Sequence, residues 1–241
     1  MPYGKFWGIG VGPGDPELLT LKAKRILEEI DFLFIPRSHS EKRSLAFSII
    51  SELIDKDWQT IDLILPMTRD KEELRKHWQA AAAKVIETLQ NGQDAAFITL
   101  GDPTLFSTFT YLLNEVQKLV PDLEVEIIPG ISSVTSISAW IKEPLVEGEE
   151  SLLIIPAEEK FANLASYLPH FDNIMIMKAG RYIERIHNLL EAQPNRSQVF
   201  LASRCGFADG YFTSDLKSVQ GQEFDYLSSV LIKKNSRGDK Q

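Results

Sequence analysis

Three segments of the chain combine glycine, proline and small polar residues directly after a predicted strand. They are the first corner (residues 8–16, Gly-Ile-Gly-Val-Gly-Pro-Gly-Asp-Pro), the second corner (residues 99–107, Thr-Leu-Gly-Asp-Pro-Thr-Leu-Phe-Ser) and the third corner (residues 127–133, Ile-Ile-Pro-Gly-Ile-Ser-Ser). Glycine lets a ligand approach the backbone closely, and the start of a helix offers unpaired amides to polar ligand groups. The corners therefore predict a site that binds a small ligand through main-chain groups.

The spacing of the glycines argues against two common nucleotide-binding motifs. A dinucleotide fingerprint has glycine at offsets 0, 2 and 5, but offset 5 is Pro13 counted from Gly8 and Asp15 counted from Gly10. A phosphate loop ends in Gly-Lys-Ser/Thr, which the first corner lacks. A nucleotide-dependent oxidoreductase is therefore disfavoured.

Each corner alone also fits an ordinary turn. Asp102 is a natural N-cap, and Pro103 suits the first turn of a helix that would run to Leu119. Ser132 could cap the helix that follows the third corner in the same way. The structural and the ligand-binding interpretations both remain open at each corner.

Strands and helices alternate along the first half of the chain. The predicted strands are residues 6–11, 32–35, 61–65 and 95–100, and the predicted helices are residues 17–30, 44–53, 70–90 and 103–119. This alternation predicts a parallel sheet with helical crossovers. Beyond Pro121-Asp122 we predict strands 124–128, 151–155, 174–177, 198–202 and 228–233, with helices 132–140, 161–168 and 182–190. The fold class is therefore α/β, with domains at residues 1–122 and 123–241 and a frayed tail from Lys234.

Composition and charge narrow the class of function. The 241 residues are 44% hydrophobic and 25% charged, as in an ordinary globular protein. The net charge of -8 opposes capture of phosphate backbones, so we expect a small-molecule substrate and no nucleic acid. The sequence has no apolar run of the ~18 residues that a membrane span needs and no signal-like start, so we expect no membrane association. Cys205 is the single cysteine, which excludes a cysteine-based metal cluster and fits a reducing, cytoplasmic location.

Taken together and in this order, the corners resemble the tetrapyrrole methylase family of S-adenosylmethionine-dependent enzymes. The likeness rests on residues 10–23 (Gly-Val-Gly-Pro-Gly-Asp-Pro-Glu-Leu-Leu-Thr-Leu-Lys-Ala), on Gly101-Asp102-Pro103 and on residues 129–133 (Pro-Gly-Ile-Ser-Ser). The order of elements extends it over the whole chain. Within the family, the chain length, residues 32–37 and residues 177–181 are most similar to the branch that methylates C-20 of precorrin-2 or cobalt-factor II.

The resemblance implies two α/β domains with a cofactor cleft between them, usually in a homodimer. It implies S-adenosylmethionine as the methyl donor, a polycarboxylate tetrapyrrole as the acceptor and no protein-bound metal. The positions that match donor contacts of the family are Pro13, Gly101, Asp102, Leu105, Ser132, Ser133, Met177, Cys205, Gly206 and Ser229.

Methyl transfer from a sulfonium needs an in-line nucleophile about 3–3.5 Å from the methyl carbon and the exclusion of water. The proposed nucleophile, C-20, later loses a proton, so a general base helps without being obligatory. Asp102, Lys178 and Tyr226 are candidates for polar groups near this carbon. The alternatives are a helix cap for Asp102, a solvated surface lysine for Lys178 and a buried core aromatic for Tyr226.

An acidic protein that binds a polycarboxylate needs a local basic rim. The candidates are Arg37, His39, Lys42, Arg43, Arg181 and Arg204, although each could be a solvated charge. Other functions also remain open: methylation at another tetrapyrrole position, methylation of an RNA or a protein, and binding of the donor without catalysis. The sequence does not say whether the acceptor ring carries cobalt.

Overall fold

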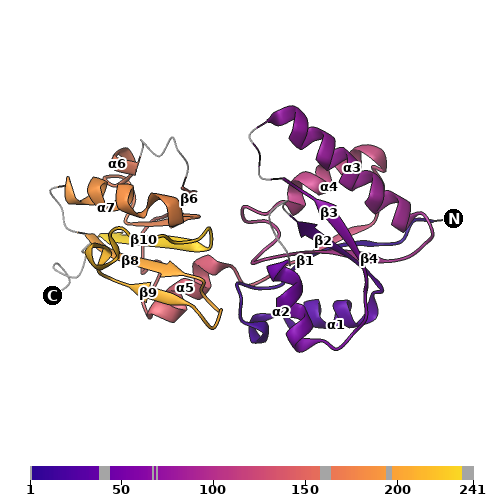
Figure 1. The fold of residues 1–241 in the computed structure, drawn as a ribbon, viewed down its shortest axis with the longest axis horizontal. Coiled ribbons are helices and arrows are strands. Elements are labelled where there is room, and N and C mark those ends of the chain that lie inside the picture. The colour runs from indigo at the N-terminus through magenta and orange to yellow at the C-terminus, as the bar shows by residue number, and fades with distance from the viewer. Residues whose placement is uncertain are drawn as a thin grey trace. The chain divides into compact units, whose positions relative to one another are not determined.

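The computed structural model describes residues 2–37, 44–66, 68, 70–157, 164–193 and 197–234. These residues fall into two compact units, Met1–Ser133 and Val134–Gln241 (Figure 1). Each unit has its own five-stranded sheet and its own hydrophobic core. The two-domain α/β organisation predicted from the sequence is confirmed.

The sheet of the first unit is parallel, with the strand order β3-β2-β4-β1-β5. Its strands are β1 (Phe6–Gly10), β2 (Phe32–Arg37), β3 (Gln59–Ile64), β4 (Ala95–Thr99) and β5 (Val125–Ile128). Every residue of β4 is buried, as expected for a strand in the middle of a parallel sheet that helices cover on both faces. The strands that precede the three corners, β1, β4 and β5, are neighbours in this sheet. Their carboxyl ends therefore lie at one edge.

Helices cover both faces of the first sheet. They are α1 (Leu21–Glu29), α2 (Leu45–Leu53), α3 (Lys71–Leu89) and α4 (Phe109–Leu119), with the short 3-10 helix η1 (Pro16–Leu18) before α1. Figure 1 shows α1 and α2 on one face and α3 and α4 on the other. Phe6, Phe34, Phe97 and Phe109 are fully buried in the core beneath α3 and α4. Two aromatic contacts, from Phe109 to Phe6 and from Phe109 to Phe97, seat α4 on the sheet at centroid distances of 5.7 Å each.

Two predicted helices of the first unit begin later than expected. The helix predicted over residues 17–30 starts only at Leu21, because Thr20 accepts a hydrogen bond from the amide of Ala23 and so caps α1. The helix predicted from Pro103 starts at Phe109, because the Ser107 hydroxyl accepts from the Phe109 amide at its first turn. Asp102 is therefore not a helix N-cap, and the prediction that it caps a helix is wrong.

The sheet of the second unit is mixed, with the strand order β6-β7-β10-β8-β9. Its strands are β6 (Leu152–Pro156), β7 (Asn173–Met177), β8 (Ser197–Ser203), β9 (Tyr211–Thr213) and β10 (Ser228–Lys234). The pair β6 and β7 is parallel, whereas β10 runs antiparallel to both β7 and β8. The strand β9 was not predicted, since three residues are too few to show an alternating pattern.

Helices lie on both faces of the second sheet as well. They are α5 (Ser133–Ile141), α6 (Leu164–Tyr167) and α7 (Ile183–Glu191), with the 3-10 helices η3 (Gly180–Tyr182) and η4 (Leu216–Val219). Figure 1 shows α6 and α7 on one face and α5 on the other. Residues 161–163 of the helix predicted over 161–168, and most of the tail predicted to fray, lie outside the described residues.

The division between the units falls later than the predicted boundary after Asp122. The strand β5 pairs in parallel with β1, so the segment up to the third corner belongs to the first sheet. A turn such as Pro121-Asp122 marks the end of an element and does not by itself mark the end of a domain.

Candidate functional site

The three corners meet in the first unit. The amide of Gly101 donates to the carbonyl of Gly12 at 2.7 Å, and the amide of Gly12 donates back to the carbonyl of Gly101 at 3.4 Å, which ties the first corner to the second. The third corner approaches both: a Cβ placed on Gly130 would lie 2.1 Å from the carbonyl oxygen of Gly101, and one on Gly10 would lie 2.7 Å from the amide nitrogen of Gly130. Only glycine allows this approach, so the three corners lie together at one place in the first unit.

Gly101 presents its backbone to open space. Its φ of +71° lies in the left-handed region that favours glycine, and a Cβ placed there would meet no heavy atom within 4 Å. Pro13 is buried in the first corner, while Leu105, Ser132 and Ser133 are half-buried. The six donor-contact positions predicted in the first unit therefore lie on the converging corners, at the edge where β1, β4 and β5 end.

The Asp102 carboxylate joins the second and third corners. One oxygen accepts from the Thr104 amide at 2.8 Å and from the Thr104 hydroxyl, and the other accepts from the Gly130 amide at 3.0 Å. Thr104 was not among the predicted site residues. The bond from the Thr104 amide to Asp102 forms an Asx turn, which aspartates in turn segments commonly make, so the sequence contained a signal for it.

The predicted residues of the second unit also share one edge, where β7 and β8 end and β10 begins. The Ala179 amide donates to the Ser228 carbonyl at 2.7 Å, and the Arg204 amide donates to the Leu227 carbonyl at 3.1 Å. Met177 ends β7, Cys205 and Gly206 follow β8, and Ser229 is the second residue of β10. The structure therefore places these four positions together at that edge.

Two residues at this edge have strained backbones. Lys178 and Arg204, which directly follow β7 and β8, have φ values of +60° and +53°. Left-handed conformations are uncommon for residues with a side chain and are concentrated at functional sites. The Lys178 ammonium lies over the Tyr226 ring, 5.1 Å from its centroid. Tyr226 is 48% exposed, so its interpretation as a buried core aromatic is wrong.

Arg204 is neutralised by neighbouring carboxylates. Its guanidinium binds Asp209 at 2.7 Å and Asp225 at 3.0 Å. The hydrogen bond to Asp209, followed by that to Asp225, raises the pKa of the Arg204 guanidinium, and Arg204 in turn lowers the pKa of Asp209. Because Asp225 lies in the loop before β10, this network joins two loops at the edge.

Three of the six residues predicted to form a basic rim lie in the described part of the chain. Arg204 is engaged by its two carboxylates, Arg37 forms an ion pair with Asp62 at 2.7 Å, and Arg181 is exposed. His39, Lys42 and Arg43 lie outside the described residues.

Cys205 is buried against helix α5. The sulfur of Cys205 is 3.4 Å from the Ser136 hydroxyl of α5 and is buried in its loop. In the part of the chain that the structure describes, no cluster of three or more His, Cys, Asp or Glu side chains could hold a metal ion. Among the same residues, none of the helices is long and apolar enough to pass through a membrane.

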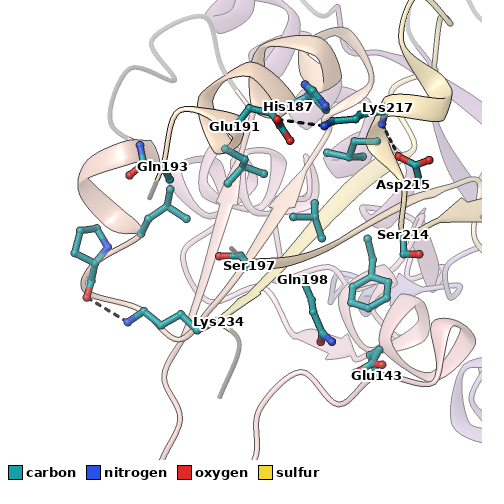
Figure 2. Close-up of a pocket in the computed structure, with 16 residues that line it drawn as sticks. Glu143, His187, Glu191, Gln193, Ser197, Gln198, Ser214, Asp215, Lys217 and Lys234 are labelled. Atoms are coloured by element: carbon teal, nitrogen blue, oxygen red, sulfur yellow. Dashed lines mark hydrogen bonds and ion pairs between the residues drawn. The ribbon is translucent and has the colours of Figure 1, made fainter. Parts of the chain in front are cut away.

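A pocket on the second unit lies elsewhere. Figure 2 shows it beside α7 and the start of β8, where Glu191 pairs with Lys217 at 3.3 Å. None of the predicted site residues lines it. This pocket is therefore separate from the predicted site residues of either unit.

Comparisons with known proteins agree with this architecture. The family model of the tetrapyrrole (corrin/porphyrin) methylases matches residues 5–219. The chain is 40% identical to the probable cobalt-precorrin-2 C(20)-methyltransferase of Methanocaldococcus jannaschii over 97% of each chain. It is 34% identical to the cobalt-precorrin-2 C(20)-methyltransferase of Salmonella typhimurium over 78% of each chain.

Solved structures share the fold at low sequence identity. A cobalt precorrin-4 methyltransferase matches with a TM-score of 0.73 and 16% identity, over 95% of this chain and 94% of that one. A uroporphyrin-III-C-methyltransferase from Thermus thermophilus matches with a TM-score of 0.66 and 21% identity, over 96% and 92%. These structures share the fold, and the family model together with the 40% identical relative shows that the chain belongs to the tetrapyrrole (corrin/porphyrin) methylases.

Proposed function

We propose that this chain transfers a methyl group from S-adenosylmethionine to carbon C-20 of precorrin-2 or cobalt-factor II, a step of cobalamin biosynthesis. The observation that carries the proposal is the 40% identity, over 97% of both chains, to a relative named as a probable cobalt-precorrin-2 C(20)-methyltransferase. Because this likeness extends over almost the full length of both proteins, it includes both units and both groups of candidate residues.

The donor is proposed to bind at the corners of the first unit and at the strand-end edge of the second. Its contacts would come from Pro13, Gly101, Asp102, Leu105, Ser132, Ser133, Met177, Cys205, Gly206 and Ser229. The open space beside the Gly101 backbone supports this assignment, because any other residue there would fill it with a Cβ. The sulfonium of the donor supplies an activated methyl group, so the protein has to orient two substrates and exclude water.

Lys178 and Tyr226 are proposed to contact the acceptor. The ammonium of Lys178 over the exposed Tyr226 ring gives a positive charge and a flat apolar face at one place. These are the groups that bind a ring substituted with carboxylates. The strained backbone at Lys178 supports a functional role for this residue.

The enzyme is further proposed to act as a homodimer in the cytoplasm. The dimer follows from the family resemblance. The single cysteine, which fits a reducing compartment, supports the proposed location.

The proposal is tested with labelled donor and a panel of acceptors. The protein is incubated anaerobically with methyl-labelled S-adenosylmethionine and with metal-free precorrin-2, cobalt-factor II, uroporphyrinogen III or ribosomal RNA. We expect a mass gain of one methyl group on precorrin-2 or cobalt-factor II only, located at C-20 by NMR of the product. Methylation of a different acceptor or of a different carbon would reassign the substrate, and the absence of turnover with all four would remove the assignment.

A further inference from the structure

The Asp102 carboxylate is held by hydrogen bonds from the chain itself. Its two oxygens accept three hydrogen bonds, two from Thr104 and one from Gly130, which is 28 residues away along the chain. An ionised carboxylate offers about four acceptor positions, so the chain itself occupies most of them. A proton on either oxygen would compete with one of these donors.

The second and third corners approach each other most closely at two glycines. Gly101 and Gly130 approach so closely that a Cβ on Gly130 would overlap the Gly101 carbonyl oxygen. Glycines bury no apolar side chain at such a contact, so a hydrogen bond across it contributes directly to the position of the two segments. The bond from the Gly130 amide to Asp102 spans these two segments directly.

We propose that Asp102 is a positioning residue, which fixes the third corner against the second and takes no proton during methyl transfer. The inference rests on the proposed function, because the corners are proposed to bind the methyl donor. It assigns Asp102 an effect on donor affinity that acts through the position of Gly130 and of the turn at Thr104.

The Asp102→Asn variant separates positioning from base catalysis. An amide has one acceptor oxygen and one donor group, so in either orientation its NH2 would face the amide of Gly130 or the amide of Thr104. The orientation with the oxygen toward Thr104 keeps two bonds, so the bond from the Gly130 amide is the one that is lost. The Thr104→Val variant is the graded control, since it removes only the hydroxyl bond and leaves both amide bonds in place.

The first readout needs no ligand. Amide hydrogen exchange of Gly130 is measured in the full chain at neutral pH, and Asp102→Asn is expected to speed it at least about tenfold, the cost of one lost bond of about 1.4 kcal/mol. Thr104→Val is expected to leave it within about twofold. Unchanged exchange in a folded Asp102→Asn protein would overturn the proposal, whether or not the protein methylates a tetrapyrrole.

The second readout is kinetic. Asp102→Asn is expected to raise the dissociation constant of S-adenosylhomocysteine and the KM for the donor about tenfold, with kcat at saturating donor within about threefold and the pH profile of kcat unchanged. A catalytic base would instead show a kcat lowered by about 10²–10⁴, an unchanged donor KM and a lost limb of the pH profile, which would overturn the proposal. Failure of the proposed function would appear differently, as a wild-type protein without turnover.

Discussion

Gly101 and Gly130 use the absence of a side chain in two distinct ways. At Gly130 the need is steric, because a Cβ would lie 2.1 Å from a carbonyl oxygen. At Gly101 the need is conformational, since φ is +71° and the space beside the residue is open. The sequence shows only glycine at both positions, and the structure separates the two causes.

Alanine substitutions should separate these causes as differences in stability. Gly101→Ala is expected to lower the free energy of unfolding by about 1 kcal/mol, the cost of a left-handed alanine. Gly148→Ala is the matched control, with φ of +58° and open space, and should cost about the same. Gly130→Ala should cost more than about 3 kcal/mol, because backbone atoms have to move. Urea unfolding checks the order, and a Gly130→Ala protein as stable as Gly148→Ala would contradict the geometry.

Residue types predicted where the glycine corners lie better than they predicted the ion pairs around Arg204. The corners could be found because glycine and proline mark places where the backbone turns tightly or is approached closely. The neutralisation of Arg204 could not, because Asp209 and Asp225 reach it through loop geometry that leaves no periodic pattern.

At the scale of elements, a hydrogen-bonded pair aligns the starts of β6 and β7. The Asp172 carboxylate accepts from the Ser151 amide at 2.9 Å and from its hydroxyl at 2.8 Å. These bonds, the amide bond being the larger cause, hold the pKa of Asp172 below its usual range. The pair lies at the opposite end of β7 from Met177 and fixes the register that places Met177 at the candidate site.

Removing this carboxylate should produce a pH-dependent loss of stability. A lowered folded pKa means that Asp172 contributes stability above its unfolded pKa of about 3.9, and that the contribution is lost as pH falls through the folded value. Because the side chain is 41% exposed, we expect Asp172→Asn to cost only about 1 kcal/mol between pH 5 and 8. The difference from wild type should shrink below pH 4 in urea unfolding. Asp122→Asn, at an exposed turn, is the control, and an Asp172→Asn penalty that persists unchanged at pH 3 would refute the explanation.

Long elements were predicted well, and short or interrupted ones were not. The helix α3 agrees with its prediction because Asp70 caps it and its pattern covers many turns. The start of α4 was misplaced because Pro103 suits either a helix or a turn, and the Ser107 hydroxyl, rather than Asp102, satisfies its first amide. The strand β9 is too short to show a period.

At the scale of the whole molecule, the first compact unit carries six of the ten proposed donor contacts and the second carries four, so neither unit is expected to act alone. The proposed homodimer has a direct test. Sedimentation equilibrium at micromolar concentration should give twice the mass of the chain. A mass equal to that of one chain at these concentrations would remove the dimer from the account without affecting the donor site.

The measurement that tests the central claim most directly is a calorimetric titration with S-adenosylhomocysteine, the demethylated donor. The claim is that the converging corners bind the donor through exposed backbone. We expect one site per chain in the wild type, an affinity lower by about tenfold or more in Gly101→Ala, where a methyl group fills the open space, and an unchanged affinity in Gly148→Ala. A wild-type protein that gives no binding, or a folded Gly101→Ala protein that binds as tightly as the wild type, would contradict it.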